Sequence, residues 1–145
     1  MKRRYFLICL GLELVILFLF RSHLGDTMPM ELSMFTGSEL MIANYSDGIL
    51  VPATLFLLAI HVAAFGLATL SKVIQLRTTL LSSIVTKLLR VFGFYLEGFS
   101  IVLMFYFFGS SIKGILLSAA SFSLLAVVLL ELFVGFKSLH PSQHS

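Results

Sequence analysis

Charged side chains are scarce in this sequence of 145 residues, at 12% of the total, whereas hydrophobic residues make up 59%. Soluble domains typically contain about 25% charged and about 45–50% apolar residues. A soluble fold with so little charge would expose large apolar patches and aggregate, so the composition indicates a lipid environment. The length allows one domain at most, and we expect a single membrane domain over residues 1–145.

Cysteine is almost absent, since Cys9 is the single one, and this excludes an internal disulfide framework. Cys9 lies inside an apolar run, where a thiol usually packs as a small hydrophobic side chain. A lipoprotein cysteine is disfavoured, because bulky Ile8 precedes it. The sequence also lacks a Walker-type loop, a GxGxxG motif and a CxxC pair.

The formal net charge is +3 and the pI is about 9.3. In a soluble protein this excess of basic residues would suggest a nucleic-acid partner. Here the basic residues cluster at the ends of apolar runs, where they are better explained by membrane topology. We therefore expect no nucleic acid as a partner.

Four apolar runs predict transmembrane helices at about residues 5–20, 49–71, 91–108 and 115–136. A crossing needs about 20 apolar residues, so the first and third runs are short. Lipid offers the backbone no hydrogen-bond partner, which favours helices. A cleaved signal peptide is the alternative for the first run, but Glu13 interrupts it and no small-x-small site follows. The expected fold class is an all-α integral membrane protein, a four-transmembrane-helix bundle with an amphipathic inner connection.

Lys and Arg are distributed unevenly between the connecting segments, and this bias predicts the orientation. With the N-terminus in the cytoplasm, only Arg21 and Lys113 lie outside, and residues 21–48 form the outer loop. The inside then holds Lys2, Arg3, Arg4, Lys72, Arg77, Lys87, Arg90 and Lys137. We expect a protein integral to a cytoplasmic (plasma) membrane, with both termini in the cytoplasm.

Two connections have a pattern of their own. In the outer loop, Thr36 and Glu39 have the spacing of a capping box, which predicts one or two short surface helices within residues 28–42. In the inner connection, apolar residues of the segment 73–89 recur at three- and four-residue spacing. This spacing predicts an amphipathic helix that either extends the second crossing or rests on the inner leaflet.

Each predicted crossing contains one ionisable residue, and these are the candidate buried polar residues: Glu13, His61, Glu97 and Glu131. A charge at the bilayer centre costs about 2.5–3.5 kcal/mol on insertion scales, so such residues normally face the bundle interior. Helical rise places all of them in the inner half or near the middle of the bilayer, and Glu97 and Glu131 at comparable depth. They either hold a proton, a cation or a polar ligand, or pair with inner basic residues and fasten the helices.

No cofactor, no metal and no catalytic residue is expected. A haem site is disfavoured because His61 has no second histidine at matching depth: His23 lies in the outer loop, and His140 and His144 lie in the tail. The methionines of the outer loop are interpreted as an apolar face rather than as a copper site. A nucleophilic serine is disfavoured because no paired base exists for Ser110, Ser111, Ser118, Ser121 or Ser123, so we expect no enzyme.

The predicted architecture is similar to that of many small bacterial membrane proteins, including membrane-embedded immunity proteins against pore-forming toxins, although no motif carries this likeness. The first functional hypothesis is a small non-enzymatic accessory subunit or interaction/immunity-type factor. The alternative is a proton- or cation-coupled transport component that uses the buried carboxylates and His61. Besides the lipid bilayer, the expected partner is another membrane protein or a second copy of the chain. Convergence of the ionisable side chains would favour transport.

Overall fold

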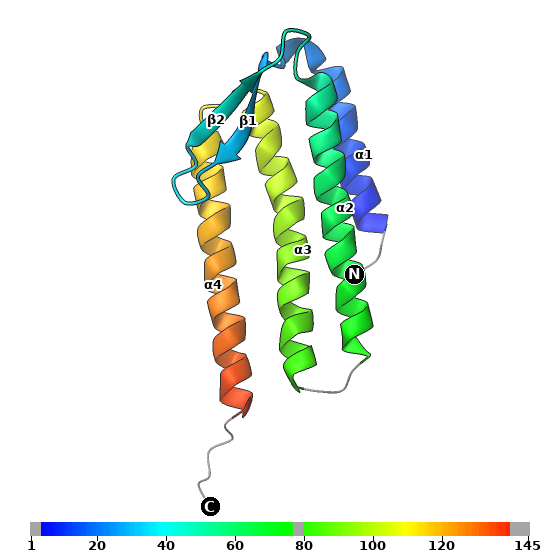
Figure 1. The fold of residues 1–145 in the computed structure, drawn as a ribbon, viewed down its shortest axis with the longest axis vertical. Coiled ribbons are helices and arrows are strands. Elements are labelled where there is room, and N and C mark those ends of the chain that lie inside the picture. Colours follow the sequence, from blue (N-terminus) through cyan, green and yellow to red (C-terminus); the bar gives the residue numbers. More distant parts are fainter. Residues whose placement is uncertain (1–3, 77–79, 140–145) are drawn as a thin grey trace, which may run out of the picture.

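Figure 1 shows the protein as a computed structural model, which describes residues 4–76 and 80–139. This part of the chain contains helices and a small sheet, in the order α1 (Arg4–Leu19), η1 (Arg21–His23), β1 (Thr27–Leu32), β2 (Glu39–Asn44), α2 (Leu50–Gln75), α3 (Leu80–Phe107) and α4 (Lys113–Leu139). The prediction of a mostly helical protein is confirmed. The prediction of an all-α fold is wrong, because two strands form a hairpin.

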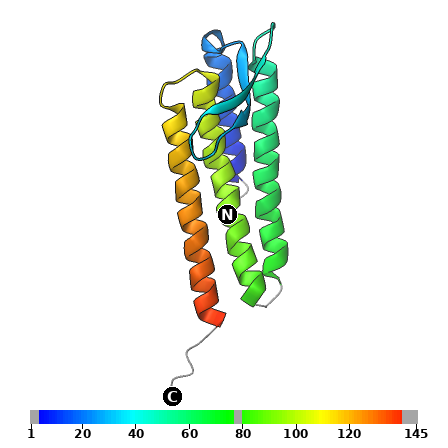
Figure 2. The same cartoon turned by 60° about the vertical axis from the view of Figure 1, so that its left-hand side comes forward.

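The long helices lie side by side and run in alternating directions, with α3 between α2 and α4 (Figures 1 and 2). The α1 helix packs against α2 and α3 toward the end of the bundle that carries the strands, here called the hairpin end. It has 16 residues, whereas α2, α3 and α4 have 26, 28 and 27. At about 1.5 Å per residue, α1 is about 24 Å long against about 40 Å for the others, and it covers only part of their length.

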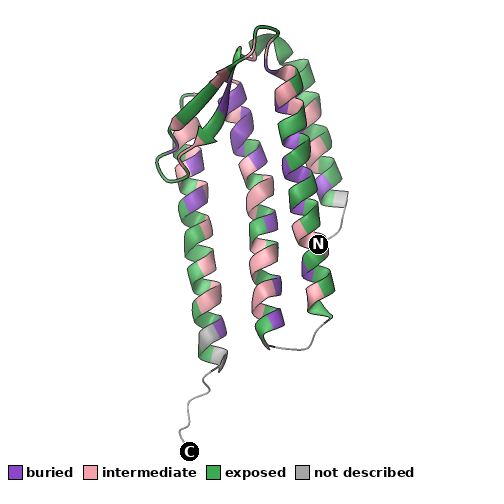
Figure 3. Cartoon of the chain, viewed as in Figure 1, coloured by how far each residue is buried: buried purple, intermediate pink, exposed green. Residues whose placement is uncertain are grey.

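Three helices, α2, α3 and α4, are long and apolar enough to cross a membrane. Only 28%, 28% and 11% of the residues in their most apolar windows are buried inside the protein. Figure 3 shows exposed residues along the whole length of these helices, so lipid is the solvent that suits their outer surface. The α1 helix is also apolar, but its length falls short of a typical crossing of about 20 residues.

The long helices extend beyond the apolar runs at the end opposite the hairpin. The α3 helix begins at Leu80 rather than near residue 91, and α2 continues to Gln75. The predicted amphipathic connection is therefore no helix of its own, because its described residues form the adjoining ends of α2 and α3. Polar contacts join these ends, since Thr86 Oγ1 donates to Ser71 O at 3.5 Å and Arg90 donates to Gln75 Oε1.

The outer loop forms an antiparallel β-hairpin, and the prediction of short surface helices within residues 28–42 is wrong. Leu32 pairs with Glu39 at the turn, where the N–H of Gly37 donates to Ser33 O at 2.7 Å. Gly37 has φ +66°, a left-handed conformation that glycine adopts without steric cost. The chain therefore reverses where a helix would have to continue, and Thr36 lies in the turn instead of capping a helix.

The hairpin is fastened to α3 and α4. The Tyr106 hydroxyl donates to Gly37 O at 2.6 Å, and Lys113 Nζ lies 2.5 Å from Glu39 Oε1. The backbones of Gly37 and Gly114 approach so closely that a Cβ on Gly37 would collide with the Gly114 carbonyl. The hairpin is therefore a packed part of the bundle rather than a free loop.

The largest group of buried hydrophobic residues lies toward the hairpin end, where α1, α2, α3 and β1 meet. It includes Leu17 of α1, Met28 of β1 and Phe107 of α3. On α2, buried residues recur at three- and four-residue spacing along one stripe, formed by Ala53, Leu57, Ile60, His61 and Ala64. This stripe faces the other helices, and it carries His61 into the interior of the bundle.

Candidate functional site

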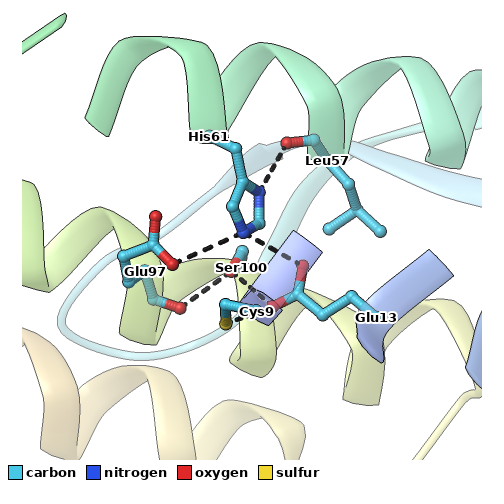
Figure 4. A network of polar contacts seen from close by, with 6 residues as sticks. All are labelled: Cys9, Glu13, Leu57, His61, Glu97 and Ser100. Atoms are coloured by element: carbon cyan, nitrogen blue, oxygen red, sulfur yellow. Dashed lines mark hydrogen bonds and ion pairs between the residues drawn. The ribbon is translucent and has the colours of Figure 1, made fainter. Parts of the chain in front are cut away.

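His61 enters the bundle in a fixed orientation. Its side chain is 3% exposed, and Nδ1 lies 2.9 Å from Leu57 O, one helical turn earlier (Figure 4). Because a carbonyl oxygen only accepts, Nδ1 carries the hydrogen of this bond. The other ring nitrogen, Nε2, then points away from α2 toward α1 and α3, so the side chains of these two helices decide what it can bind.

Glu13 reaches the same place from α1. It is 4% exposed, and one of its oxygens, Oε1, accepts a hydrogen bond of 2.6 Å from the Ser100 hydroxyl of α3. The Cys9 thiol, one turn earlier on α1, donates to the same oxygen at 3.7 Å. The second oxygen, Oε2, lies 3.7 Å from His61 Nε2. Ser100 therefore ties α1 to α3 and turns the free oxygen of Glu13 toward the histidine.

Glu97 of α3 completes the group. Its Oε2 lies 3.4 Å from His61 Nε2, and its side chain is 14% exposed. Three ionisable side chains from α1, α2 and α3 thus converge on one point, as Figure 4 shows. We call Glu13, His61 and Glu97 the buried triad.

The buried triad has hydrogen-bonding capacity that the described residues do not use. Glu13 Oε2, His61 Nε2 and Glu97 Oε1 have no hydrogen-bond partner within the described part of the chain. The distances of 3.4 and 3.7 Å from Nε2 exceed the range of about 2.7–3.2 Å for an N–H···O bond. A buried polar atom without a partner costs about 1–3 kcal/mol, so a network built only to hold helices together would be expected to pair these atoms.

The charges of the buried triad do not balance by themselves. Two carboxylates face one imidazole, and within residues 4–76 and 80–139 neither carboxylate has an ion pair with Lys or Arg. Even with a protonated histidine, two ionised carboxylates leave one negative charge in a low-dielectric setting. The buried triad therefore has an excess of acidic over basic groups.

Glu131 does not belong to this group. It lies on α4 and pairs with Lys87 of α3, whose Nζ is 3.4 Å from Glu131 Oε2, and both side chains are partly exposed. Lys87 precedes Glu97 on α3 by about 15 Å of helical rise, toward the end opposite the hairpin. The expectation that Glu97 and Glu131 lie at comparable depth is therefore wrong, because α3 is longer than its apolar run and Glu131 lies level with Lys87 instead. The expected alternative of pairing with a basic residue agrees with the contact of Glu131 to Lys87.

The buried triad lies near the middle of the long helices, somewhat toward the hairpin end. His61 follows the first residue of α2, Leu50, by about 16 Å, and Glu97 precedes the last residue of α3, Phe107, by about 15 Å. Because α3 begins at Leu80, Glu97 is also much farther from the opposite end than the apolar run alone indicates. The site is therefore near the depth at which ionisable side chains cost most in a bilayer.

A lateral cleft of about 600 Å³ leads to the site between α1 and α3. Cys9 and Glu13 lie at one end of its lining, and Phe108 and Ser110 lie at the other, beyond the last residue of α3. Its wall is otherwise formed by apolar side chains. The cleft runs along Glu13 toward the hairpin end, and the Oε2 atom of Glu13 is itself buried.

Sequence reasoning missed two members of this network, Ser100 and Cys9. Both were within reach of helical spacing, since Ser100 follows Glu97 by three residues and Cys9 precedes Glu13 by four, which places each pair on one helix face. Cys9 was interpreted as a small hydrophobic side chain, but its thiol instead contacts the carboxylate of Glu13.

Comparisons with protein-family models, with curated proteins and with solved structures found no match to this chain.

Proposed function

We propose that the protein is a component of a proton- or cation-coupled transport system, with the buried triad as its cation-binding site. The observation that supports this proposal is the convergence of Glu13, His61 and Glu97 from three helices, each with an atom that has no hydrogen-bond partner among the described residues. Ionisable residues inside transmembrane bundles commonly mark ion pathways and proton relays. The proposal includes four crossings, with α1 as the shortest one, and both termini in the cytoplasm of a plasma membrane.

The experiment compares flux and yield in vesicles. The full chain is reconstituted into liposomes, and flux is followed with a pH-sensitive dye and with dyes for metal cations under an imposed gradient. Glu97→Gln is expected to abolish flux with little loss of folded protein, because the amide keeps the size of the carboxylate but loses its charge. Glu131→Gln is the matched control and is expected to retain flux, since Glu131 pairs with Lys87 outside the triad. Normal flux through the Glu97 variant would refute the proposal.

The orientation is tested separately. Lys2, Arg3 and Arg77, which contribute to the charge bias, lie outside the described residues. Ser46 lies in the exposed connection between β2 and α2. In intact cells, a cysteine at Ser46 is expected to react with a membrane-impermeant maleimide, and a reporter fused after residue 145 is expected to be active only inside. A reporter active outside the cell would overturn the proposed topology.

A second candidate function is that of an accessory or interaction factor, and the outer surface of the hairpin favours it. Met30, Phe35, Leu40 and Met41 are each more than half exposed there, on a structured and apolar element. A partner membrane protein or a second copy of the chain would cover such a surface. A photocrosslinker at Met41 is expected to give one discrete protein adduct in cells, with Leu129 on α4 as the control position. Adducts to lipid alone would argue against this function.

A further inference from the structure

We infer that the buried triad, together with Cys9, is a binding site for a divalent transition-metal ion of the Zn²⁺ class. The inference rests on the proposed function, since it names the cation that the same site takes. The Cys9 Sγ, a ring nitrogen of His61 and a carboxylate oxygen of Glu97 all lie within 4.8 Å of one another. Glu13 brings its second oxygen to the same histidine nitrogen at 3.7 Å.

The donor atoms select the class of metal. Thiolate, imidazole and carboxylate together are the ligands that Zn²⁺ takes in proteins, usually as a set of four or as three with an open position. Mg²⁺ and Ca²⁺ prefer oxygen ligands throughout, which a site with sulfur and nitrogen does not provide. On binding, the Cys9 thiol loses its proton to solvent and becomes a thiolate ligand. The thiolate and the carboxylate of Glu97 then balance the two charges of the ion, and Glu13 contributes a neutral oxygen ligand when its carboxyl group is protonated.

The distances fit a shared ion better than direct hydrogen bonds. For metal–ligand bonds of about 2.0–2.3 Å, the ligand atoms of a tetrahedral site are about 3.3–3.6 Å apart. His61 Nε2 lies 3.4 Å from Glu97 Oε2 and 3.7 Å from Glu13 Oε2, at or just beyond this spacing. Both His61 Nε2 and Glu13 Oε2 belong to side chains that are more than nine-tenths buried, and neither atom has a hydrogen-bond partner within residues 4–76 and 80–139.

The surroundings of the site also match those of a metal ligand set. Metal-binding histidines commonly donate their other ring N–H to a backbone carbonyl, and ligating carboxylates are themselves hydrogen-bonded. His61 Nδ1 contacts Leu57 O at 2.9 Å, and Ser100 donates to Glu13 Oε1 at 2.6 Å. Ser100 is thus a positioning residue for Glu13. Cys9 and Glu13 also line the cleft between α1 and α3, so the proposed ligand set lies beside this cleft.

Cobalt(II) is the probe for this site, because it takes the place of zinc and absorbs visible light when its coordination is tetrahedral. The full chain, purified in detergent and treated with a chelator, is expected to bind one equivalent of Co²⁺ and to release it to Zn²⁺. The spectrum is expected to contain a thiolate-to-cobalt charge-transfer band. His61→Gln should weaken Co²⁺ binding by more than the factor of about 10–100 typical for loss of a residue that orients a ligand, and Ser100→Ala should weaken it by about that factor.

Two matched controls separate this site from surface binding. His23→Gln and Glu131→Gln are expected to bind Co²⁺ as the unchanged protein does, because both residues lie outside the buried triad. If His61→Gln does not fold, Cys9→Ser decides, and it should retain folded protein while losing the charge-transfer band. No saturable Co²⁺ binding, binding lost with His23, or a charge-transfer band that persists in Cys9→Ser would overturn the inference.

The flux assay distinguishes failure of this inference from failure of the proposed function. Proton flux that depends on Glu97 in chelator-treated vesicles, from a protein that binds no Co²⁺, would refute the metal site and leave the transport proposal standing. Stoichiometric Co²⁺ binding that depends on His61, from a protein that moves no cation across vesicles, would refute transport and support the metal site.

Discussion

Replacing Ser100 by alanine tests the link between α1 and α3 most directly. Ser100 is fully buried, and its hydroxyl donates to Glu13 Oε1 at 2.6 Å. Neither lipid nor water can replace this donor, because Glu13 is also only 4% exposed. The hydroxyl also lies 2.8 Å from Glu97 O on its own helix, so the variant removes this local contact together with the link to Glu13.

The expected loss is about 1.5–2 kcal/mol in the free energy of unfolding. Hydrogen bonds to charged groups contribute about 1.5–3 kcal/mol in proteins generally. Hydrogen bonds between helices in membranes average about 0.6 kcal/mol and reach about 1.7 kcal/mol. Because the acceptor is a carboxylate and the site is fully buried, we expect the Ser100 bond to contribute near the lower end of the range for charged groups. This value is close to the upper end of the range for helices in membranes.

Unfolding by increasing SDS in mixed micelles, followed by circular dichroism, measures this loss in the full chain. The sequence has no tryptophan, so fluorescence of that residue is no alternative. Ser123→Ala is the matched control, because Ser123 is exposed and its hydroxyl donates to Ala119 O of the same helix at 2.8 Å. The control should change stability by less than about 0.5 kcal/mol. Equal effects of the two substitutions would refute the assignment of Ser100 as the link to Glu13.

Two further substitutions test how the hairpin is fastened. Gly37→Ala should lower the free energy of unfolding by at least about 1–2 kcal/mol, because the left-handed backbone disfavours a Cβ and the added carbon would strike the α4 backbone. Gly25→Ala is the control, since a Cβ there meets no atom closer than 3.8 Å. Limited proteolysis of the hairpin is the measurement. Lys113→Gln should remove the partly exposed pair with Glu39 and cost up to about 1 kcal/mol, and this difference should shrink in high salt. A cost that salt does not change would refute an ionic origin.

The helices and the inward-facing residues could be predicted from the sequence, because both depend on local properties. Long apolar runs predict helices in lipid, and an ionisable residue inside such a run predicts a partner within the bundle. The convergence of Glu13, His61 and Glu97 depends on the rotation of three helices about their axes, which the apolar runs do not determine. The spacing of Cys9 to Glu13 and of Glu97 to Ser100 contained part of that information.

The errors arose where a local pattern allowed two structures. Thr36 and Glu39 have the spacing of a helix cap, but Gly37 between them adopts a positive φ and closes a hairpin turn instead. The comparable depth of Glu97 and Glu131 was predicted from an α3 that began near residue 91. Once α3 begins at Leu80, a lysine of the added turns lies opposite Glu131 and satisfies it.

The structural and the functional interpretations of the buried triad differ in what they predict for its removal. If the three side chains only fasten the helices, replacing all of them by leucine should lower the free energy of unfolding, because the contacts between α1, α2 and α3 at this site are lost. If they hold a cation, the unpaired atoms make the empty site unfavourable, and replacing buried ionic groups by apolar ones of similar volume is often neutral or stabilising by about 1–4 kcal/mol.

We therefore expect the combined variant Glu13→Leu, His61→Leu, Glu97→Leu to fold with equal or greater stability and to lose all cation binding and flux. SDS titration and the vesicle assay measure the two properties on one preparation. Each single substitution to leucine should be less stable than the triple one, because it leaves the other ionisable side chains buried without their counterpart. A triple variant that is less stable than every single variant would show that the buried triad stabilises the packing of α1, α2 and α3, and this result would refute the cation site.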